Sequence, residues 1–396
     1  MRTARGFTLI ELMVTMLIAS VAVAAVSTVF LTQVQLYQRH EGRRSSQSSA
    51  RVSLTFLEER VRRAGYGVDP ALAFIPFDSY DAATDAGGVN FPDAVAVHSR
   101  DPSFTARTLT AAADDSLDFT PALTEALEPG QILLAVCSGG ESHAYSVVSA
   151  QALAGATNVK LRNAAGAESP RGAPGPRFHQ QAQLNDGCYD DGTATLIKVE
   201  RSSFYLAAFD DDRDAATPAV PYLMLHRGLD SNGDGSFNAD DSVPLAQGVE
   251  QLQLAYILNS NDDAPPAIVG VTDAPGYGDA WAASATGPEM EDFYSAASRL
   301  VNHPANIRQV RITLVVRGAV REQERAGDDA ITGEAGAALA SGAIPWRALE
   351  NLGTPVTAPA FSPQAGGYAR TVLRVSVAPK NLLMKNQFQS PAVGGG

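Results

Sequence analysis

The sequence predicts an α+β protein: a long N-terminal helix, apolar in its first half, packed on an elaborated antiparallel β-sheet body. No proline occurs between Met1 and Asp69, so one helix can span that interval. Residues 12–31 are apolar or small, broken only by hydroxyl-bearing side chains. The remainder alternates short β-branched runs with loops rich in Gly, Pro and Asp, a pattern typical of strands joined by turns.

Composition narrows the class of protein further. With 396 residues and 45% hydrophobic content, the chain can bury one large elaborated core or two smaller ones. A charged fraction of 18% argues against a disordered chain. The 30 Lys and Arg against 43 Asp and Glu give a net charge of −13, which disfavours nucleic acid as a partner. Six His and two Cys leave little material for a transition-metal site.

The N-terminal segment has the length and charge of a membrane span. Leu12 to Leu31 supplies the roughly 20 apolar residues that a spanning helix needs. Arg2 and Arg5 precede it, which predicts a cytoplasmic N-terminus and an extracytoplasmic remainder. Glu11 is anomalous, because a carboxylate in hydrocarbon costs a few kcal/mol on insertion scales. It therefore needs a partner, or a hydrated position at the bilayer boundary.

The stretch from Gly6 to Val14, GFTLIELMV, resembles the class III signal of type IV prepilins and pseudopilins. The resemblance implies that residues 1–6 are a leader peptide, which a prepilin peptidase removes by cutting between Gly6 and Phe7. It also implies that the new Phe7 amine is N-methylated and that Glu11 pairs with the N-terminal amine of a neighbouring subunit. Such a buried pair would select the assembly register, because an unpaired buried charge is strongly destabilising.

An ordinary secretory signal is the rival interpretation of the same segment. Leu12–Ala25 would be its apolar stretch, and Ala22-Val23-Ala24 would be its cleavage site. Alanine-rich membrane helices produce such triplets by chance, and this interpretation leaves Glu11 unexplained. We therefore favour the prepilin signal, with residues 7–31 as a transmembrane and filament-core helix.

The helix is expected to continue as an amphipathic second half over residues 32–67. Leu54, Leu57, Val61 and Ala64 recur at helical spacing, with charged residues on the other faces. The glycines of Gly65-Tyr66-Gly67 predict the end of the helix. The first half would lie in the membrane or in a filament core, and the second half needs a globular partner. This layout is pilin-like.

Residues 68–396 are expected to form a β-rich extracytoplasmic globular body. Long loops are predicted at 163–187, 259–288 and 318–366. A Gly139-Gly140 turn joins two of the strand candidates into a hairpin. The strand candidates are Asp93–Ser99, Gln131–Cys137, Ala144–Ser149, Val159–Arg162, Leu196–Leu206, Tyr222–His226, Val249–Leu258, Ile307–Arg317 and Tyr368–Ala378.

Four looser stretches, at 62–67, 129–138, 248–256 and 370–375, resemble the PilW family of minor pilins. The resemblance implies a structural subunit of the type IV pilus, in a priming or tip complex needed for pilus assembly and twitching motility, with adhesion as a further role. Implied partners are other minor pilins, the major pilin, the prepilin peptidase, the inner membrane and a tip adhesin. The precursor would be a single-pass inner-membrane protein with a periplasmic body, and the mature subunit would lie in the pilus at the cell surface.

Two other functions stay open at this point. A J-type minor pseudopilin of a type II secretion system shares the same N-terminus, although such subunits are generally much shorter. A membrane-tethered binding domain or enzyme with an ordinary anchor is the third class. The sequence contains no H-E-x-x-H, no G-x-S-x-G and no Gly-rich phosphate loop after a strand, so we predict no catalytic residues and no enzyme.

Cys137 and Cys188 are the chain's two cysteines. They could be unrelated free thiols, but outside the cytoplasm an isolated pair is more often a disulfide. A bridge between them would close about 50 residues and stabilise the fold by up to about 4 kcal/mol on the loop-entropy model.

The stretch from Asp230 to Asp241, DSNGDGSFNADD, fits a twelve-residue calcium loop at several positions. Hard oxygen ligands on alternate residues are what Ca²⁺ prefers, with Gly235 at the sharp turn. Asp241 replaces the usual Glu at position 12. The residues on either side of the stretch look like strands, so this would be a single calcium loop rather than one of a pair of EF-hands. A surface turn rich in Asp, Asn and Gly is the alternative. The candidate ligands are Asp230, Asn232, Asp234, Asn238 and Asp241.

Overall fold

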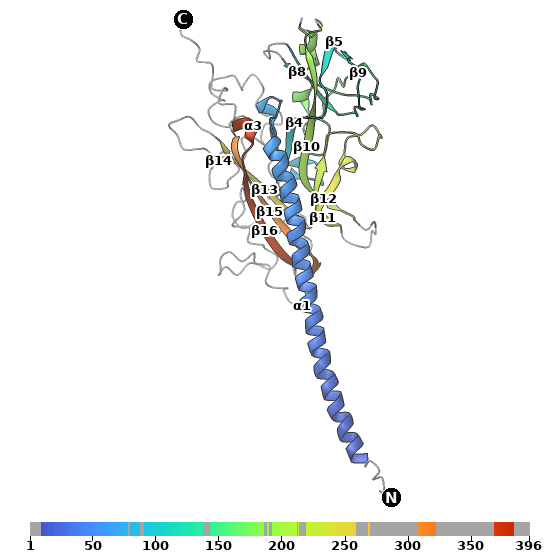
Figure 1. Ribbon diagram of the computed structural model, residues 1–396, viewed down its shortest axis with the longest axis vertical. Helices are drawn as coiled ribbons and strands as arrows, with labels where there is room; N and C mark the ends of the chain where they lie inside the picture. The colour runs from blue at the N-terminus through green and yellow to red at the C-terminus, as the bar shows by residue number, and fades with distance from the viewer. Residues whose placement is uncertain are drawn as a thin grey trace.

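A computed structural model gives the arrangement of the chain (Figure 1). The residues that it describes are 9–77, 80–87, 91–137, 143–185, 188–189, 192–211, 213, 219–258, 268–269, 307–321 and 368–383.

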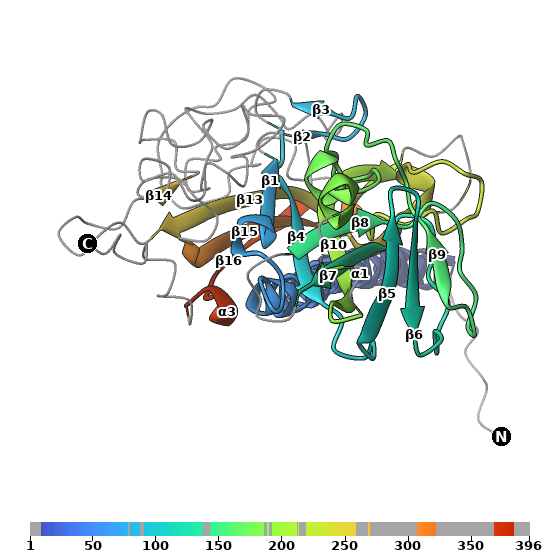
Figure 2. The same cartoon turned by 90° about the horizontal axis from the view of Figure 1, so that it is seen from above.

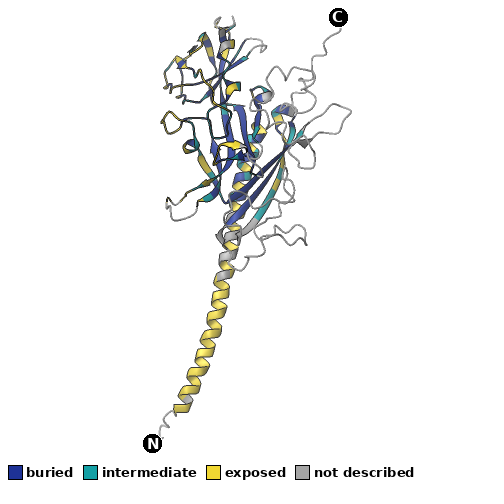
Figure 3. Cartoon of the chain, turned by 180° about the vertical axis from the view of Figure 1, so that it is seen from behind, coloured by how far each residue is buried: buried dark blue, intermediate teal, exposed yellow. Residues whose placement is uncertain are grey.

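One helix, α1 (Leu9–Arg63), runs from the N-terminal end into the body without a break. At 1.5 Å per residue its 55 residues extend about 82 Å. Its first half stands clear of the body and is exposed on all sides, as Figure 3 shows. Gly65 and Gly67 follow its last turn with φ of 76° and 64°, a left-handed conformation that ends helices and that glycine adopts without strain. The long helix expected from the sequence is confirmed.

The larger sheet is antiparallel and centred on β10 (Thr195–Phe209). The second half of β10 pairs with β4 (Ala94–Arg100) on one side and β11 (Val220–His226) on the other. At the sheet's two margins, β1 (Phe74–Phe77) pairs with β4, and β12 (Val243–Gln247) pairs with β11. A separate two-stranded hairpin consists of β2 (Tyr80–Asp81) and β3 (Ala86–Gly87).

The first half of β10 takes part in a closed barrel, seen at the right of Figure 2. The other barrel strands are β5 (Arg107–Ala113), β6 (Ser116–Thr120), β7 (Ile132–Val136), β8 (His143–Val147) and β9 (Asn158–Lys160). From β10 the ladder passes through β5, β6 and β9, and it returns through β8 and β7 to β10. The closure between β9 and β8 is a bridge from Leu161 to Val148, with Ser149 N–H donating to Lys160 O at 2.9 Å.

The barrel interior is filled by its own apolar core. Leu109, Phe119, Leu133 and Leu196 are at most 2% exposed, and each comes from a different strand. The short helices η2 (Pro176–Phe178) and η3 (Gln181–Asn185) pack against the barrel from the 163–187 segment, which the sequence predicted to be a plain loop. Because side chains fill this barrel, it is a packed unit rather than a container.

The smaller sheet covers the second half of α1. Its strand order is β14 (Ile268–Val269), β13 (Val249–Leu258), β15 (Ile307–Arg321) and β16 (Tyr368–Val377), all antiparallel. Leu57 and Val61 of α1 are fully buried against apolar residues of both sheets. The short α3 (Lys380–Leu383) contacts the end of α1, and η1 (Pro70–Leu72) and η4 (Ala239–Asp241) are single turns.

The expected α+β, pilin-like layout is therefore confirmed: an N-terminal apolar helix precedes a mostly antiparallel β body. Of the predicted long loops, 259–288 and 318–366 lie almost entirely outside the described residues, as does the expected Gly139-Gly140 turn. The strands on either side of that turn, β7 and β8, do pair with each other.

Candidate functional site

The membrane-type segment is the exposed first half of α1. Leu12–Val34 is long and apolar enough to cross a membrane, and none of its most apolar window is buried in the body. Several hydroxyls within it donate to carbonyls of the same helix, as a hydrocarbon environment requires. Thr15 donates to Leu12 O at 2.9 Å, Ser20 to Leu17 O at 2.8 Å and Thr28 to Ala25 O at 2.8 Å. The segment can therefore lie in lipid or against other apolar helices without an unpaired hydroxyl at these positions.

The predicted processing residues Gly6 and Phe7 lie outside the described part of the chain. Glu11 lies within the first turns of α1, but its side chain is also outside the described residues. The roles assigned to these three residues therefore stay predictions.

The second half of α1 is anchored to the body by polar contacts as well as by its apolar stripe. Arg60 pairs with Glu200 of β10 at 3.0 Å. At the helix end, Asn381 of α3 donates from Nδ2 to Arg63 O at 3.0 Å, which satisfies one of the last carbonyls. A Cβ on Gly65 would lie 2.7 Å from Leu382 Cδ2, so α3 packs directly on the helix terminus. The second half of the helix is thus held to the body by both polar and apolar contacts.

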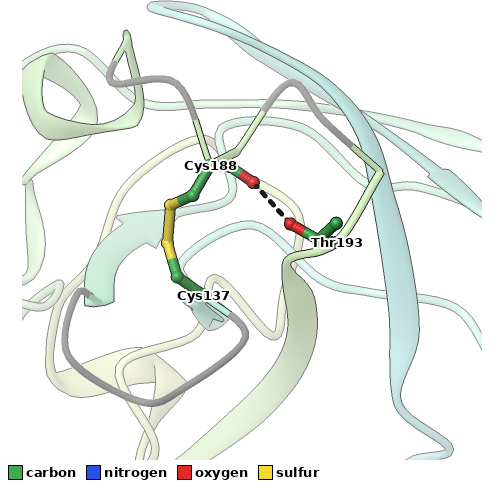
Figure 4. The surroundings of a disulfide bond; sticks show 3 residues. All are labelled: Cys137, Cys188 and Thr193. Carbon is green, nitrogen blue, oxygen red and sulfur yellow. Dashed lines mark hydrogen bonds between the residues drawn. A yellow bond between two sulfur atoms is a disulfide. The ribbon is translucent and has the colours of Figure 1, made fainter.

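Cys137 and Cys188 form a disulfide bond, with their Cα atoms 5.9 Å apart (Figure 4). Cys137 directly follows β7, and Cys188 follows η3. Leu184 and Tyr189, which flank Cys188, are buried in the barrel core. The bond therefore ties the η3 segment to the end of the barrel strand β7.

The predicted calcium loop lies between β11 and β12 and folds around two inward carboxylates. Asp230 accepts hydrogen bonds from the backbone N–H groups of Gly233, Asp234 and Gly235 at 2.7 to 3.2 Å. Asp230 is 5% exposed. Gly233 and Gly235 adopt φ of 74° and 83°, the left-handed conformation that the turn needs.

The second inward carboxylate, Asp241, closes the loop from its other end. It accepts N–H bonds from Ser231, Asn232 and Asn238 at 2.7 to 3.2 Å. Burial raises the pKa of Asp241, but these hydrogen bonds outweigh burial and hold the pKa below its usual range.

The remaining candidate ligands make local contacts. Asn232 donates from Nδ2 to Asp234 Oδ2 at 3.1 Å, and Asn238 caps η4. Among the described residues, no three His, Cys, Asp or Glu side chains come together in a way that could hold a metal ion. The carboxylates instead bind the loop's own backbone, which fits the alternative of a self-supported turn. Calcium binding stays a prediction.

A buried group of ionisable residues lies between β10, β4 and the 168–179 segment. Arg201 and Glu168 form an ion pair at 3.1 Å, with side-chain exposures of 1% and 5%. His98 lies directly across the ladder from Arg201, and His226 lies across from Ser203. Burial, followed by the charge of Arg201, lowers the pKa of His226 to about 4 and lowers that of His98 well below its usual value.

These two histidines are neutral core residues. His98 Nδ1 lies 2.8 Å from Leu72 O, and His226 Nδ1 accepts the Gly228 N–H at 2.8 Å. The burial of these histidines could not be predicted from the sequence, because the spacing of the six histidines carries no periodic signal. Through these contacts the two side chains hold the backbone at Leu72 and Gly228.

Comparison with known proteins gives one match. Residues 1–27 match the sequence profile of the prokaryotic N-terminal methylation motif. No curated protein sequence and no solved structure matches the chain. The matched segment contains Gly6, Phe7 and Glu11 and extends into the apolar half of α1. The motif implies processing by a prepilin peptidase and association with pilus components and the membrane, and it suggests a structural subunit. With the exposed apolar helix behind it, the motif indicates a type IV pilin or pseudopilin-like protein, consistent with a membrane-anchored precursor.

Proposed function

We propose that this protein is a minor pilin of the type IV pilus, of the PilW type, acting as a structural subunit in the priming or tip complex. The observation that carries the proposal is the size of the body relative to its single assembly helix. A body of about 330 residues has a radius of gyration of about 20 Å. Packed helices lie only about 8–10 Å apart. Many copies side by side would therefore crowd one another, and a few copies at the filament end would not.

The proposed mechanism is assembly rather than chemistry. The apolar half of α1 moves from lipid into a bundle of like helices, and its exposed surface is available for that packing. Glu11 pairs with the methylated Phe7 amine of a neighbour and sets the register. The boundaries that we propose are 1–6 for the leader, 7–31 for the membrane and filament-core helix, 32–67 for the amphipathic half and 68–396 for the body. The body contacts other minor pilins, and adhesion is a further role of its surface.

A J-type pseudopilin at the tip of a secretion pseudopilus is the second candidate, because the methylation motif is common to both systems. Deletion of the gene separates the two. Loss of surface pili and twitching with intact protein secretion supports the minor pilin. Loss of secretion with intact pili supports the pseudopilin.

Direct detection tests the proposal in the filament itself. Mass spectrometry of sheared surface pili should find this chain, with an N-methylated Phe7 as its first residue. Gly6→Asp should leave the leader uncut and remove the chain from the pili, because a side chain at the cut site blocks close approach of the peptidase to the backbone. Thr3→Ser, within the same leader, is the matched control. A mature N-terminus near Ala25 would contradict the proposal.

A further inference from the structure

Lys198 of β10 contacts two carboxylates that come from different parts of the chain. Its Nζ lies 2.7 Å from Asp101 Oδ2 and 2.5 Å from Glu125 Oε1. Asp101 directly follows β4, and Glu125 lies in the connection between β6 and β7. An amine, a carboxyl group and a second carboxyl group therefore meet at the point where the barrel joins the larger sheet.

The backbone holds the amine and the first carboxyl group side by side. Asp101 N–H donates to Lys198 O at 2.9 Å, directly beyond the last register pair of β4 and β10. The Asp101 and Lys198 side chains are 6% and 13% exposed, and the Phe104 ring lies 5.7 Å from Nζ. Holding two reacting groups in contact gives effective concentrations of about 10⁵–10⁸ M in well-oriented systems, enough to drive condensations that are unfavourable between free molecules.

The carboxyl group of Asp101 is polarised on the side away from the lysine. Its Oδ1 accepts the Ser103 N–H at 2.8 Å and the Ser103 Oγ–H at 2.6 Å. Two donors fixed on one oxygen stabilise the negative charge that gathers there when a nucleophile attacks the carboxyl carbon. The other oxygen, Oδ2, is the one that contacts the lysine and is placed to leave.

We propose that Lys198 and Asp101 condense to an intramolecular amide bond, with Glu125 relaying the proton. Lys198 Nζ forms a bond to Asp101 Cγ while the Cγ–Oδ2 bond breaks. Glu125 relays two protons in turn from Nζ to Oδ2, the third proton stays on the amide nitrogen, and Oδ2 departs as water. The ammonium and carboxylate give an amide and one water, so atoms and charge balance without any oxidant or cofactor.

The ion pair in the structure is the reactant of this step. Burial opposes the charge on Lys198, but its hydrogen bonds to Asp101 and Glu125 outweigh burial and raise its pKa. Burial also raises the pKa of Asp101, and its bonds to Lys198 and Ser103 outweigh burial and lower it. Nζ must therefore lose a proton before it can attack, and Glu125, half-exposed and in contact with Nζ, is the base in reach. The reaction is a single self-modification, expected to be slow.

The product would be a covalent tie between β10 and the chain that enters the barrel at Asp101. This tie goes beyond the proposed assembly role. It would join the segment between β4 and β5 to β10, alongside the backbone hydrogen bonds that already link β4 to β10. A force applied to the barrel would then be carried at this point by a covalent bond as well as by the hydrogen bonds of the ladder.

Mass spectrometry of the full chain, purified in detergent, tests the proposal directly. The linked protein should lack one water, about 18 Da, relative to its Lys198→Arg variant after correction for that substitution. After reduction, trypsin should release peptide 101–107 joined to peptide 178–201, because Lys198 is no longer a cleavage site. A full-mass protein that trypsin cleaves after Lys198 would overturn the proposal and leave an ordinary ion pair.

Two variants sharpen the test. Glu125→Gln should lower the linked fraction at least tenfold at equal times, as loss of a general base does. Lys160 offers an internal control, since it pairs with Asp115 at 3.5 Å but both side chains are about 60% exposed. A linked Lys160–Asp115 peptide at similar yield would show that linkage arises during handling, and it would overturn the proposal. Formation of the Cys137–Cys188 bond in each variant reports that the barrel is folded.

Discussion

Gly130 lies against the backbone of Gly228, so closely that a Cβ added to Gly130 would be 2.0 Å from the Gly228 carbonyl oxygen. The same atom would lie 2.5 Å from the Phe237 ring. The acidic 230–241 loop thus packs beside the start of β7, and Asp230 N–H donates to Pro129 O at 3.1 Å.

Gly130→Ala should therefore lower the free energy of unfolding by about 2–4 kcal/mol, from a left-handed residue and a backbone clash together. Gly155→Ala is the matched control, because Gly155 has a similar φ of 92° against 90° but no atom within 4 Å of the added Cβ. Urea unfolding of the two variants separates the cost of backbone strain from the cost of the clash with Gly228. Equal losses of unfolding free energy would mean that the clash with Gly228 adds nothing to the destabilisation.

Acid should destabilise the body through its buried histidines. An unfolded His has a pKa of about 6.5, and the folded pKa of His226 is about 4. The unfolded chain then binds more protons, so stability falls as pH drops from about 6.5 to about 4, by about 3 kcal/mol for this group. His226→Asn, which keeps an acceptor for the Gly228 N–H, should reduce the slope of stability against pH. An unchanged slope in His226→Asn would refute the assignment.

Removal of the disulfide should destabilise the barrel. Cys137→Ser opens a loop with a sequence separation of 51 residues, which the loop-entropy model values at about 4 kcal/mol at most. Thermal unfolding with and without a thiol reductant is the measurement. The reduced wild-type protein and the Cys137→Ser/Cys188→Ser double variant should melt alike, and both should melt below the oxidised protein. Identical melting of the oxidised and reduced forms would contradict a stabilising role.

Glu11→Ala should insert into the membrane normally, because the change makes the segment more apolar. If Glu11 pairs with the Phe7 amine of a neighbour as proposed, the variant should nevertheless be depleted from pili, because that amine would lose its partner. The amount of subunit in sheared pili relative to the membrane fraction is the readout. Glu41→Ala, on the same helix beyond the apolar segment, should enter pili normally. Normal incorporation of Glu11→Ala as the sole copy would make this carboxylate incidental.

Calcium binding at Asp230–Asp241 predicts a shift in thermal stability. Binding to the folded state alone adds about 2.7 kcal/mol at a hundredfold excess of ion over its dissociation constant. The chain should then melt higher in millimolar calcium than in chelator, and Asp234→Ala should remove the difference. Asp115→Ala, an exposed acid elsewhere, should retain it. Equal melting of the unmutated protein in both conditions would leave the segment a hydrogen-bonded turn.

The sequence by itself determined the parts of this protein that depend on local order. The absence of proline before Pro70 and the apolar run after Glu11 specify one long helix with a membrane-type first half, because helix hydrogen bonds join residues four apart. β13 and β15 were also predictable from their alternation of apolar and polar residues. β5 was not, because alanine and threonine dilute the alternation in RTLTAAA. β6 alternates in SLDFT, but five residues are too few to distinguish a strand from the loops around it.

The tertiary structure alone determined which residues distant in the sequence come into contact. Two cysteines allow one intramolecular pairing, but only the barrel fold shows that the bond holds η3 at the end of β7. In the acidic loop the sequence indicated ligands, and the fold turned Asp230 and Asp241 toward backbone N–H groups. The contact of Lys198 with Asp101 and Glu125 had no sequence signal at all. Pairing of β4 with β10 brings Asp101 to Lys198 across 97 positions, and the β6–β7 connection brings Glu125 to it across 73. Such non-local contacts are set by the packing of the whole fold rather than by neighbours along the chain.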